Sequence, residues 1–251
     1  MGTLLYTKDL RKSFGGLMAV NDANVSIEDR ELRSIIGPNG AGKTTFINLI
    51  TGRYPVTSGK IFFQDRDVTN KPTHELVRLG ICRTFQITSI FMGLSAFENI
   101  RMARQACLGG SLKIFSSKAD LLEVNESTWA LLEKIGLQEK ADQPAKNLAH
   151  GDQRLLEVGL ALAGNPKILI LDEPTAGMSP AETSHIADLV RQLNRDLNLP
   201  VVLIEHDMDM VMSISDRITV FHQGSMIAEG SPKEIQANTF VKEAYLGEAD
   251  E

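Results

Sequence analysis

The feature that most restricts the fold of this chain is a glycine-rich segment between a predicted strand and a predicted helix. Residues 32–36 predict a short strand, and apolar residues recur at helical spacing over residues 46–50, with Gly52 as a stop signal. Between them lies the sequence Gly37-Pro38-Asn39-Gly40-Ala41-Gly42-Lys43-Thr44-Thr45. A strand, a loop of this spacing and a helix in direct succession predict a P-loop in an α/β fold.

Each residue type in this loop suits phosphate binding. Glycines let the backbone curl so that its N–H groups point at phosphate oxygens, and the following helix adds the positive end of its dipole. Lys43 can reach the β- and γ-phosphates, and the Thr44 hydroxyl can ligate Mg²⁺. An incidental glycine turn is the alternative, but it does not account for the flanking strand and helix. We therefore expect residues 37–45 to bind a nucleoside triphosphate.

Two acidic residues follow a second apolar run, at residues 168–171, which predicts a strand buried on both faces. Ligands of open parallel sheets bind at the carboxyl ends of the strands. At such an end Asp172 can hold Mg²⁺, directly or through water, and Glu173 can polarise the attacking water as general base. A helix-capping turn before Pro174 is the alternative, and the P-loop upstream favours the metal and catalytic roles.

A histidine and a glutamine complete the candidate site. Residues 201–204 predict another buried strand, and His206 follows it closely enough to contact the γ-phosphate and orient water. Gln86 precedes a helical segment, in a place from which an amide can reach Mg²⁺ and water. A histidine at a strand end is more often structural, and a lone glutamine is a weak signal. Both assignments therefore depend on the other motifs.

The rest of the pattern predicts one domain, residues 1–251, with an insert. Residues 4–28 alternate as antiparallel strands around a Gly15-Gly16 turn. Residues 87–147 have helical spacing and predict an inserted helical subdomain, with breaks at residues 109–111 and 116–117. The predicted fold class is an α/β P-loop NTPase with a mixed core sheet, an N-terminal antiparallel β-subdomain and an inserted α-helical subdomain.

Three smaller features accompany this fold. Asp65-Arg66-Asp67 predicts a polar turn after a strand at residues 61–63. The Met-rich stretch 208–212 predicts the packing face of a helix rather than a cofactor site. Residues 218–221 and 226–228 predict a closing hairpin around Gly224.

Charge and hydropathy exclude several classes of function. A net charge of -6 makes the chain a poor candidate for broad electrostatic binding to nucleic acid. Two cysteines, Cys82 and Cys107, give no disulfide framework and predict free thiols in a reducing cytosol. No apolar run approaches the ~20 residues of a membrane span, so we expect membrane association only through a partner.

Taken together, these residues resemble the ABC transporter ATPase family over nearly the whole chain. In that family a P-loop, a Q-loop, a signature segment, an Asp-Glu box, a D-loop and a switch histidine occur in this order. Their counterparts are residues 37–45, Gln86, Leu148 to Gln153, Asp172-Glu173, residues 176–179 and His206. The resemblance also implies that Phe14 stacks on adenine, whereas its spacing alone also suits a half-buried strand residue.

The resemblance implies a dimer mechanism with ATP and Mg²⁺ as cofactors. ATP would lie between the P-loop of one ATPase subunit and the signature segment of another, where Ala149 and Gly151 would contribute in this chain. Binding would close a homo- or heterodimer and drive two membrane permease subunits, served indirectly by a periplasmic solute-binding protein. The chain would then lie in the cytoplasm, peripheral on the inner face of the membrane, without nucleic acid.

Local strings are similar to one subfamily, the ATP-binding subunits of branched-chain amino acid importers and of related importers for small polar solutes. These strings are Arg83-Thr84-Phe85-Gln86, residues 176–180, residues 205–212 and Ala244-Tyr245-Leu246-Gly247-Glu248. Lipopolysaccharide-export ATPases have a similar ending and are the alternative, but they usually keep Ser-Gly-Gly in the signature.

Two further alternatives come from other classes. ABC ATPases of DNA repair carry a long coiled coil, and those of translation join two cassettes in one chain. Neither feature is present in this sequence. A nucleotide-binding regulatory module without turnover is the third alternative, and the predicted base Glu173 argues against it.

The signature segment departs from the usual Leu-Ser-Gly-Gly-Gln, and the departure generates a prediction. Ala149 replaces the serine whose hydroxyl would contact the γ-phosphate, although Gly151 and the helix predicted to begin near Asp152 still offer backbone donors. Our hypothesis is that the subunit pairs with a non-identical ATPase and that the site using this signature is the weaker one. Ala149→Ser should therefore raise transport-coupled ATPase activity, and an unchanged rate counts against the hypothesis.

Overall fold

The computed structural model describes residues 2–84, 90–107 and 118–246, and the chain divides into two compact units. The first unit comprises Met1–Leu76 and Val190–Glu251, and the second comprises Val77–Leu189. The boundaries lie within two helices, α2 (Thr73–Leu79) and α6 (Pro180–Leu197). The predicted limits of the helical insert, 87–147, stay a prediction.

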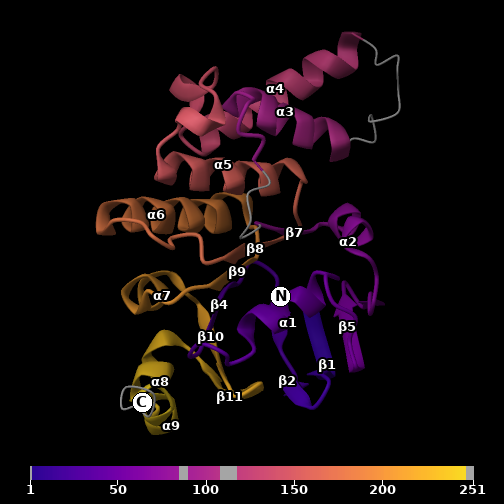
Figure 1. The fold of residues 1–251 in the computed structure, drawn as a ribbon, viewed down its shortest axis with the longest axis vertical. Helices are drawn as coiled ribbons and strands as arrows, with labels where there is room; N and C mark the ends of the chain where they lie inside the picture. Colours follow the sequence, from indigo (N-terminus) through magenta and orange to yellow (C-terminus); the bar gives the residue numbers. More distant parts are fainter. Residues whose placement is uncertain (1, 85–89, 108–117, 247–251) are drawn as a thin grey trace. The chain divides into compact units, whose positions relative to one another are not determined.

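An antiparallel sheet forms the N-terminal part of the first unit (Figure 1). Its long strand β1 (Thr3–Phe14) pairs with β2 (Leu17–Ala23), β3 (Ser26–Glu28) and β5 (Ser58–Phe63). Gly15 makes the β1–β2 turn with a φ of 59°, a conformation that suits glycine. The antiparallel strands predicted from residues 4–28 are confirmed.

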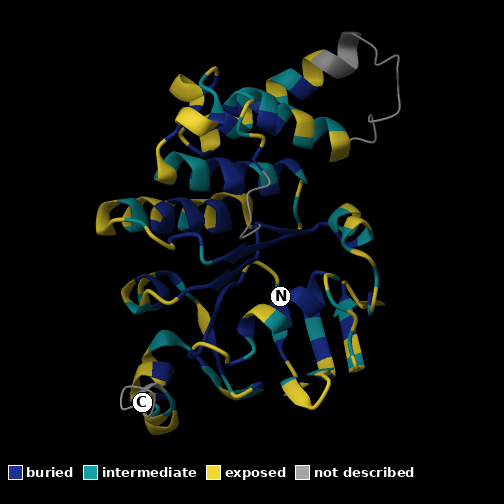
Figure 2. Ribbon diagram, in the orientation of Figure 1, coloured by how far each residue is buried: buried dark blue, intermediate teal, exposed yellow. Residues whose placement is uncertain are grey.

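The other sheet of the first unit has the strand order β11-β10-β4-β9. The strand β4 (Leu32–Ile36) runs parallel to β10 (Arg217–His222) and to β9 (Val201–Ile204), and β10 forms an antiparallel hairpin with β11 (Ser225–Gly230). Every residue of β4 and β9 is buried, as their dark blue ribbons show (Figure 2). The strands predicted at 32–36 and 201–204 have the observed bounds, and the hairpin is confirmed.

A buried cluster joins the sheet to the last helices of the first unit. Its helices are α7 (Met208–Ile214), α8 (Pro232–Ala237) and α9 (Thr239–Leu246). The cluster consists of Ile36, Val211, Ile218, Val220, Ile235 and Val241. Met208 and Met212 pack against it, which confirms that the Met-rich stretch is a packing face. Ile36 precedes the glycine-rich loop directly, so this core holds the end of β4 from which the loop starts.

In the second unit two short parallel strands accompany a group of helices. The strand β7 (Ile81–Arg83) pairs with β8 (Ile168–Asp172). The helices α3 (Ala96–Cys107), α4 (Lys118–Lys134) and α5 (His150–Ala163) lie against one another (Figure 1), with two 3₁₀ turns at Gln138–Lys140 and Ala145–Asn147. The predicted breaks at 109–111 and 116–117 lie outside the described residues.

Close helix packing in the second unit depends on Gly159. A Cβ at this position of α5 would come within 2.7 Å of Ile135 Cδ1 and 3.0 Å of Ile100 Cδ1. Both isoleucines are buried, so their methyl groups occupy the space that a side chain on α5 would need. The glycine therefore sets how near α5 approaches its neighbours.

Two predicted boundaries were wrong. The turn after β5 consists of Gln64 and Asp65, with φ of 50° and 58°, while Arg66–Asp67 forms the strand β6, paired with β5. Positive φ at both turn positions matches the twist of a two-residue hairpin, which polar composition alone did not reveal. The helix α5 begins at His150 rather than near Asp152, with Ala149 as its N-cap residue.

Two further observations concern the cysteines and the helices. Cys107 is exposed, whereas Cys82 is buried on β7, and burial raises the pKa of the Cys82 thiol to about 12. Within the three described ranges, no helix has both the length and the apolar character that crossing a bilayer requires.

The buried cluster that contains Ile36 and Ile235 predicts that substitutions of two isoleucines differ in their effect on stability. Ile235 is 2% exposed, whereas Ile227 on β11 is 38% exposed. Ile235→Ala should lower the free energy of unfolding by about 2–5 kcal/mol, because it leaves a cavity against β4 and α7. Ile227→Ala should cost roughly 0.5 kcal/mol or less. Urea denaturation of both variants measures the difference, and equal losses would contradict the packing described.

Candidate functional site

The glycine-rich loop joins β4 to the helix α1 (Lys43–Ile50) in the first unit. Gly37, Gly40 and Gly42 have φ of 149°, 78° and 99°. A Cβ on Gly37 would overlap the carbonyl oxygen of Phe221, and a Cβ on Gly42 would overlap that of Ala19. Glycine is required at both positions because the backbones of β10 and β2 pass so close to the loop. The strand, loop and helix predicted around residues 37–45 are confirmed.

Lys43 is held inside this loop. Its ammonium donates hydrogen bonds to the carbonyl oxygens of Gly37, at 2.5 Å, and Pro38, at 2.9 Å, and the residue is 5% exposed. Gly42 caps α1 without any side-chain hydrogen bond, and the first turn of the helix contains no acidic residue. The loop therefore presents a buried cation and a helix N-terminus, a combination that suits an anion.

Thr44 and Thr45 lie at the start of the same helix, with Thr44 exposed and Thr45 half-buried. Asn39 and Gly40 are exposed, while Pro38 and Ala41 are buried. The loop thus turns its central residues and the Thr44 side chain toward solvent.

Phe14 lies at the end of β1 and is 44% exposed. Its ring meets the Tyr54 ring edge to face, with centroids 5.5 Å apart, and the Lys12 ammonium lies 4.9 Å from its centroid. These contacts fix the ring, yet much of it remains accessible. An exposed, fixed aromatic ring suits base stacking better than a half-buried place in a strand.

Asp172 ends β8 in the second unit and is 3% exposed. Its Oδ2 forms an ion pair with Nη2 of Arg83 at 2.5 Å, while its buried Oδ1 accepts no hydrogen bond within the described ranges. Glu173 follows with a φ of 50°, a strained conformation for a residue with a side chain. The buried Oδ1 of Asp172 is a single hard oxygen, and it suits a hard cation such as Mg²⁺ or a water bound to that cation.

His206 follows β9 in the first unit and is exposed. The backbone N–H of His206 donates to the buried carboxylate of Glu205 at 3.0 Å. The next residue, Asp207, caps α7 by accepting a hydrogen bond from the N–H of Met210 at 2.9 Å. The backbone on both sides of the histidine is therefore fixed, although its ring reaches solvent.

The signature segment and the D-loop lie together in the second unit. His150 Cε1 is 3.7 Å from the position that a Cβ on Gly177 would take, and a Cβ on Gly151 would come within 2.8 Å of Glu182 Oε1. The backbone N–H and hydroxyl of Ser179 donate to Glu182 and hold the pKa of its carboxyl below the usual value, with a smaller contribution from His150. Ala149 provides no side-chain cap to α5.

The structure thus groups the predicted residues by unit. The loop 37–45, Phe14 and His206 belong to the first unit, whereas Asp172, Glu173, Ala149 and Gly151 belong to the second. Gln86 lies outside the described residues. The contacts of Arg83 with Asp172 and of Glu182 with Ser179 were not predicted from the sequence. The only signal for them was that each is a charged residue close to a motif.

A family model described as ABC transporter matches residues 20–176, which is more than half of the chain. The chain belongs to this family. A second model, described as branched-chain amino acid ATP-binding cassette transporter, matches residues 225–251. The chain is therefore an ATP-binding ATPase of the ABC transporter type, as the resemblance implied.

Individual relatives match over almost the full length. The high-affinity branched-chain amino acid transport ATP-binding protein LivG of Escherichia coli K12 is 43% identical, over 98% of both chains. The corresponding protein BraF of Pseudomonas aeruginosa is 41% identical, also over 98% of both. A crystal structure of the ADP conformation of an ABC transporter cassette has a TM-score of 0.86 and 31% identity, covering 98% of this chain and 100% of its own.

The backbone approach at the loop predicts unequal effects of two glycine substitutions. Gly40 has no neighbouring atom within 4 Å of a built Cβ, so Gly40→Ala should cost only the left-handed backbone strain, about 1–2 kcal/mol. Gly42→Ala adds overlap with the Ala19 carbonyl and should cost clearly more. Thermal unfolding of the nucleotide-free variants tests this, and equal midpoints would show that the loop does not lie against β2 as described.

Proposed function

We propose that this chain is the ATPase subunit of an importer for branched-chain amino acids or related small polar solutes. The observation that carries the proposal is similarity to LivG and BraF over 98% of the chain. It continues beyond the ATPase model into residues 225–251, where the branched-chain amino acid transporter model matches. No observation favours lipopolysaccharide export over uptake, so export is not proposed.

In this proposal the first unit binds the nucleotide. Phe14 stacks on adenine, the loop 37–45 surrounds the phosphates, and Lys43 exchanges its two carbonyl contacts for phosphate oxygens. A buried ammonium needs such partners, because an unpaired charge at 5% exposure is costly. His206 contacts the γ-phosphate from the end of β9.

The second unit supplies the carboxylate proposed to bind metal, Asp172, and the proposed catalytic carboxylate, Glu173. Asp172 and Gln86, together with Thr44 of the first unit, would hold Mg²⁺, and the ion would neutralise charge on the phosphates. Glu173 polarises the attacking water as general base. Ala149 and Gly151 serve the nucleotide of a partner ATPase through the N-terminus of α5.

The proposed assembly contains two ATPase subunits, identical or not, and two membrane permeases, with a periplasmic solute-binding protein as an indirect partner. The chain itself lies on the cytoplasmic face of the membrane in this proposal. Closure of the ATPase pair on ATP supplies the differential binding energy that shifts the permeases between two states.

The proposal is tested by reconstituting the chain with its permeases in liposomes and measuring ATP hydrolysis and leucine uptake together. Glu173→Gln should bind ATP normally and lower turnover by about 10²–10⁴-fold, because the water loses its base. Glu243→Gln, which changes an exposed carboxylate on α9, is the matched control and should leave both rates intact.

Two outcomes would overturn parts of the proposal separately. A Glu173→Gln variant that hydrolyses ATP at the wild-type rate would remove Glu173 as base. Wild-type hydrolysis that responds to no branched-chain amino acid, with its periplasmic receptor present, would remove the proposed substrate class while leaving the ATPase intact.

A further inference from the structure

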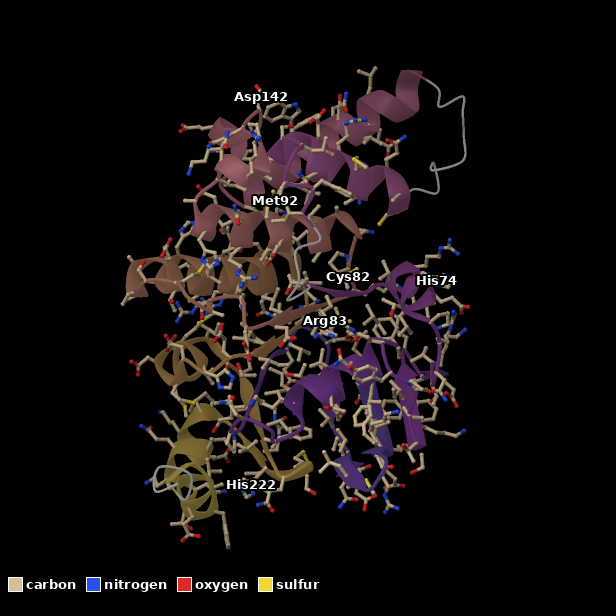
Figure 3. The ribbon with its side chains drawn as sticks, in the orientation of Figure 1. His74, Cys82, Arg83, Met92, Asp142 and His222 are labelled. Atoms are coloured by element: carbon tan, nitrogen blue, oxygen red, sulfur yellow. The ribbon has the colours of Figure 1, made fainter. Side chains whose placement is uncertain are left out.

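A buried ion pair between Arg83 and Asp172 lies at the carboxyl ends of the strands of the second unit, where Figure 3 labels Arg83. The side chains are 4% and 0% exposed, and Arg83 Nη2 lies 2.5 Å from Asp172 Oδ2. The two residues are 89 positions apart in sequence. Only the fold brings them together.

The parallel register of β7 and β8 produces this contact. Arg83 lies opposite Ile170, and the N–H of Thr84 donates to the carbonyl oxygen of Ile170 at 2.9 Å. The hydroxyl of Thr84 in turn accepts a hydrogen bond from the N–H of Asp172 at 3.3 Å. Backbone and side-chain contacts therefore fix both ends of the pair against sliding.

The two oxygens of the Asp172 carboxylate have different surroundings. Arg83 holds Oδ2, whereas Oδ1 is buried and accepts no hydrogen bond from the described part of the chain. Leaving a charged oxygen unsatisfied in a protein interior is costly. The arginine thus fixes the carboxylate in an orientation that leaves one oxygen for another cation or for its bound water.

A contribution to stability does not explain why this buried ion pair is present. The cost of removing two charges from water offsets most of their attraction, so a buried ion pair contributes little net stability. Its stronger effect is to hold a carboxylate in one orientation, as partners of metal ligands do. An arginine suits this task because it stays charged at every relevant pH.

We propose that Arg83 is a positioning residue for the magnesium site, and that it acts by orienting Asp172 rather than by touching nucleotide or metal. The proposal rests on the proposed function, in which Asp172 serves Mg²⁺. Arg83 immediately precedes the residues that lead to Gln86 in the sequence. The ion pair therefore links the proposed metal ligand Asp172 to β7, and the predicted metal ligand Gln86 follows β7 in the sequence.

The test is calorimetric titration of the full chain with ADP, once with excess Mg²⁺ and once with EDTA. The ratio of the two dissociation constants reports the contribution of the metal without any turnover. In Arg83→Gln this ratio should fall at least about 10-fold from the wild-type value, whereas the EDTA affinity stays the same. Arg83→Lys should retain part of the ratio, because it keeps a cation without the planar fork.

Two controls separate positioning from general destabilisation. Arg154→Gln removes another ion pair of the second unit, with Glu157 at 2.7 Å, and should lower the thermal midpoint without changing the ratio. Asp172→Asn should abolish the metal contribution if the proposed function is right. A wild-type ratio retained in Asp172→Asn would defeat that metal role itself.

The positioning role is overturned if folded Arg83→Gln keeps the wild-type ratio while Asp172→Asn loses it. It is equally overturned if Arg154→Gln lowers the ratio as much as Arg83→Gln does. Should Arg83→Gln fail to fold, Arg83→Lys decides by the same ratio, and a wild-type value there rejects the proposal.

Discussion

The close approach of the glycine-rich loop to two neighbouring strands is the constraint on which the candidate site depends. Gly37 lies against the carbonyl of Phe221 and Gly42 against that of Ala19, so no side chain fits at either position. The same approach fixes Lys43 over the carbonyls of Gly37 and Pro38. These contacts fix the shape of the loop, and an ordered loop lowers the ordering cost of the proposed nucleotide binding.

Buried strands that end in polar residues repeat this arrangement in both units. β4 leads into the loop, β9 is followed closely by His206, and β8 ends at Asp172, directly before Glu173. Because each strand is buried along its length, its end is placed by packing rather than by the functional residue itself. Strain can therefore be tolerated where it occurs, as in the left-handed backbone of Glu173.

Much of the fold could be predicted because its signals are local. The strands at 32–36 and 201–204 and the loop between strand and helix were predicted from adjacent residues, and the structure has them. The turn at Gln64-Asp65 was misplaced because several neighbouring residues are polar, and backbone twist decides among them. The start of α5 at His150 was missed because Ala149 carries no capping side chain to mark it.

The partners of the site residues could not be predicted, because they depend on strand register. Nothing in the sequence around Asp172 indicates Arg83 as its partner, since the pairing of β7 with β8 creates the contact. Likewise, the buried cluster brings Ile235 and Val241 together with Ile36, although most of the chain separates them in sequence. Local motifs therefore indicated an ATPase, while the register of the strands determined which charged residue pairs with Asp172.

In the proposed function the loop binds phosphate, and Lys43 changes partners when nucleotide binds. A crystal structure of the full chain with Mg²⁺ and ADP would show both the phosphate position and the partners of Lys43. We expect the β-phosphate to lie within residues 37–45, and the Lys43 ammonium to move from the carbonyls of Gly37 and Pro38 to phosphate oxygens. ADP bound elsewhere, with Lys43 still on those two carbonyls, would contradict it.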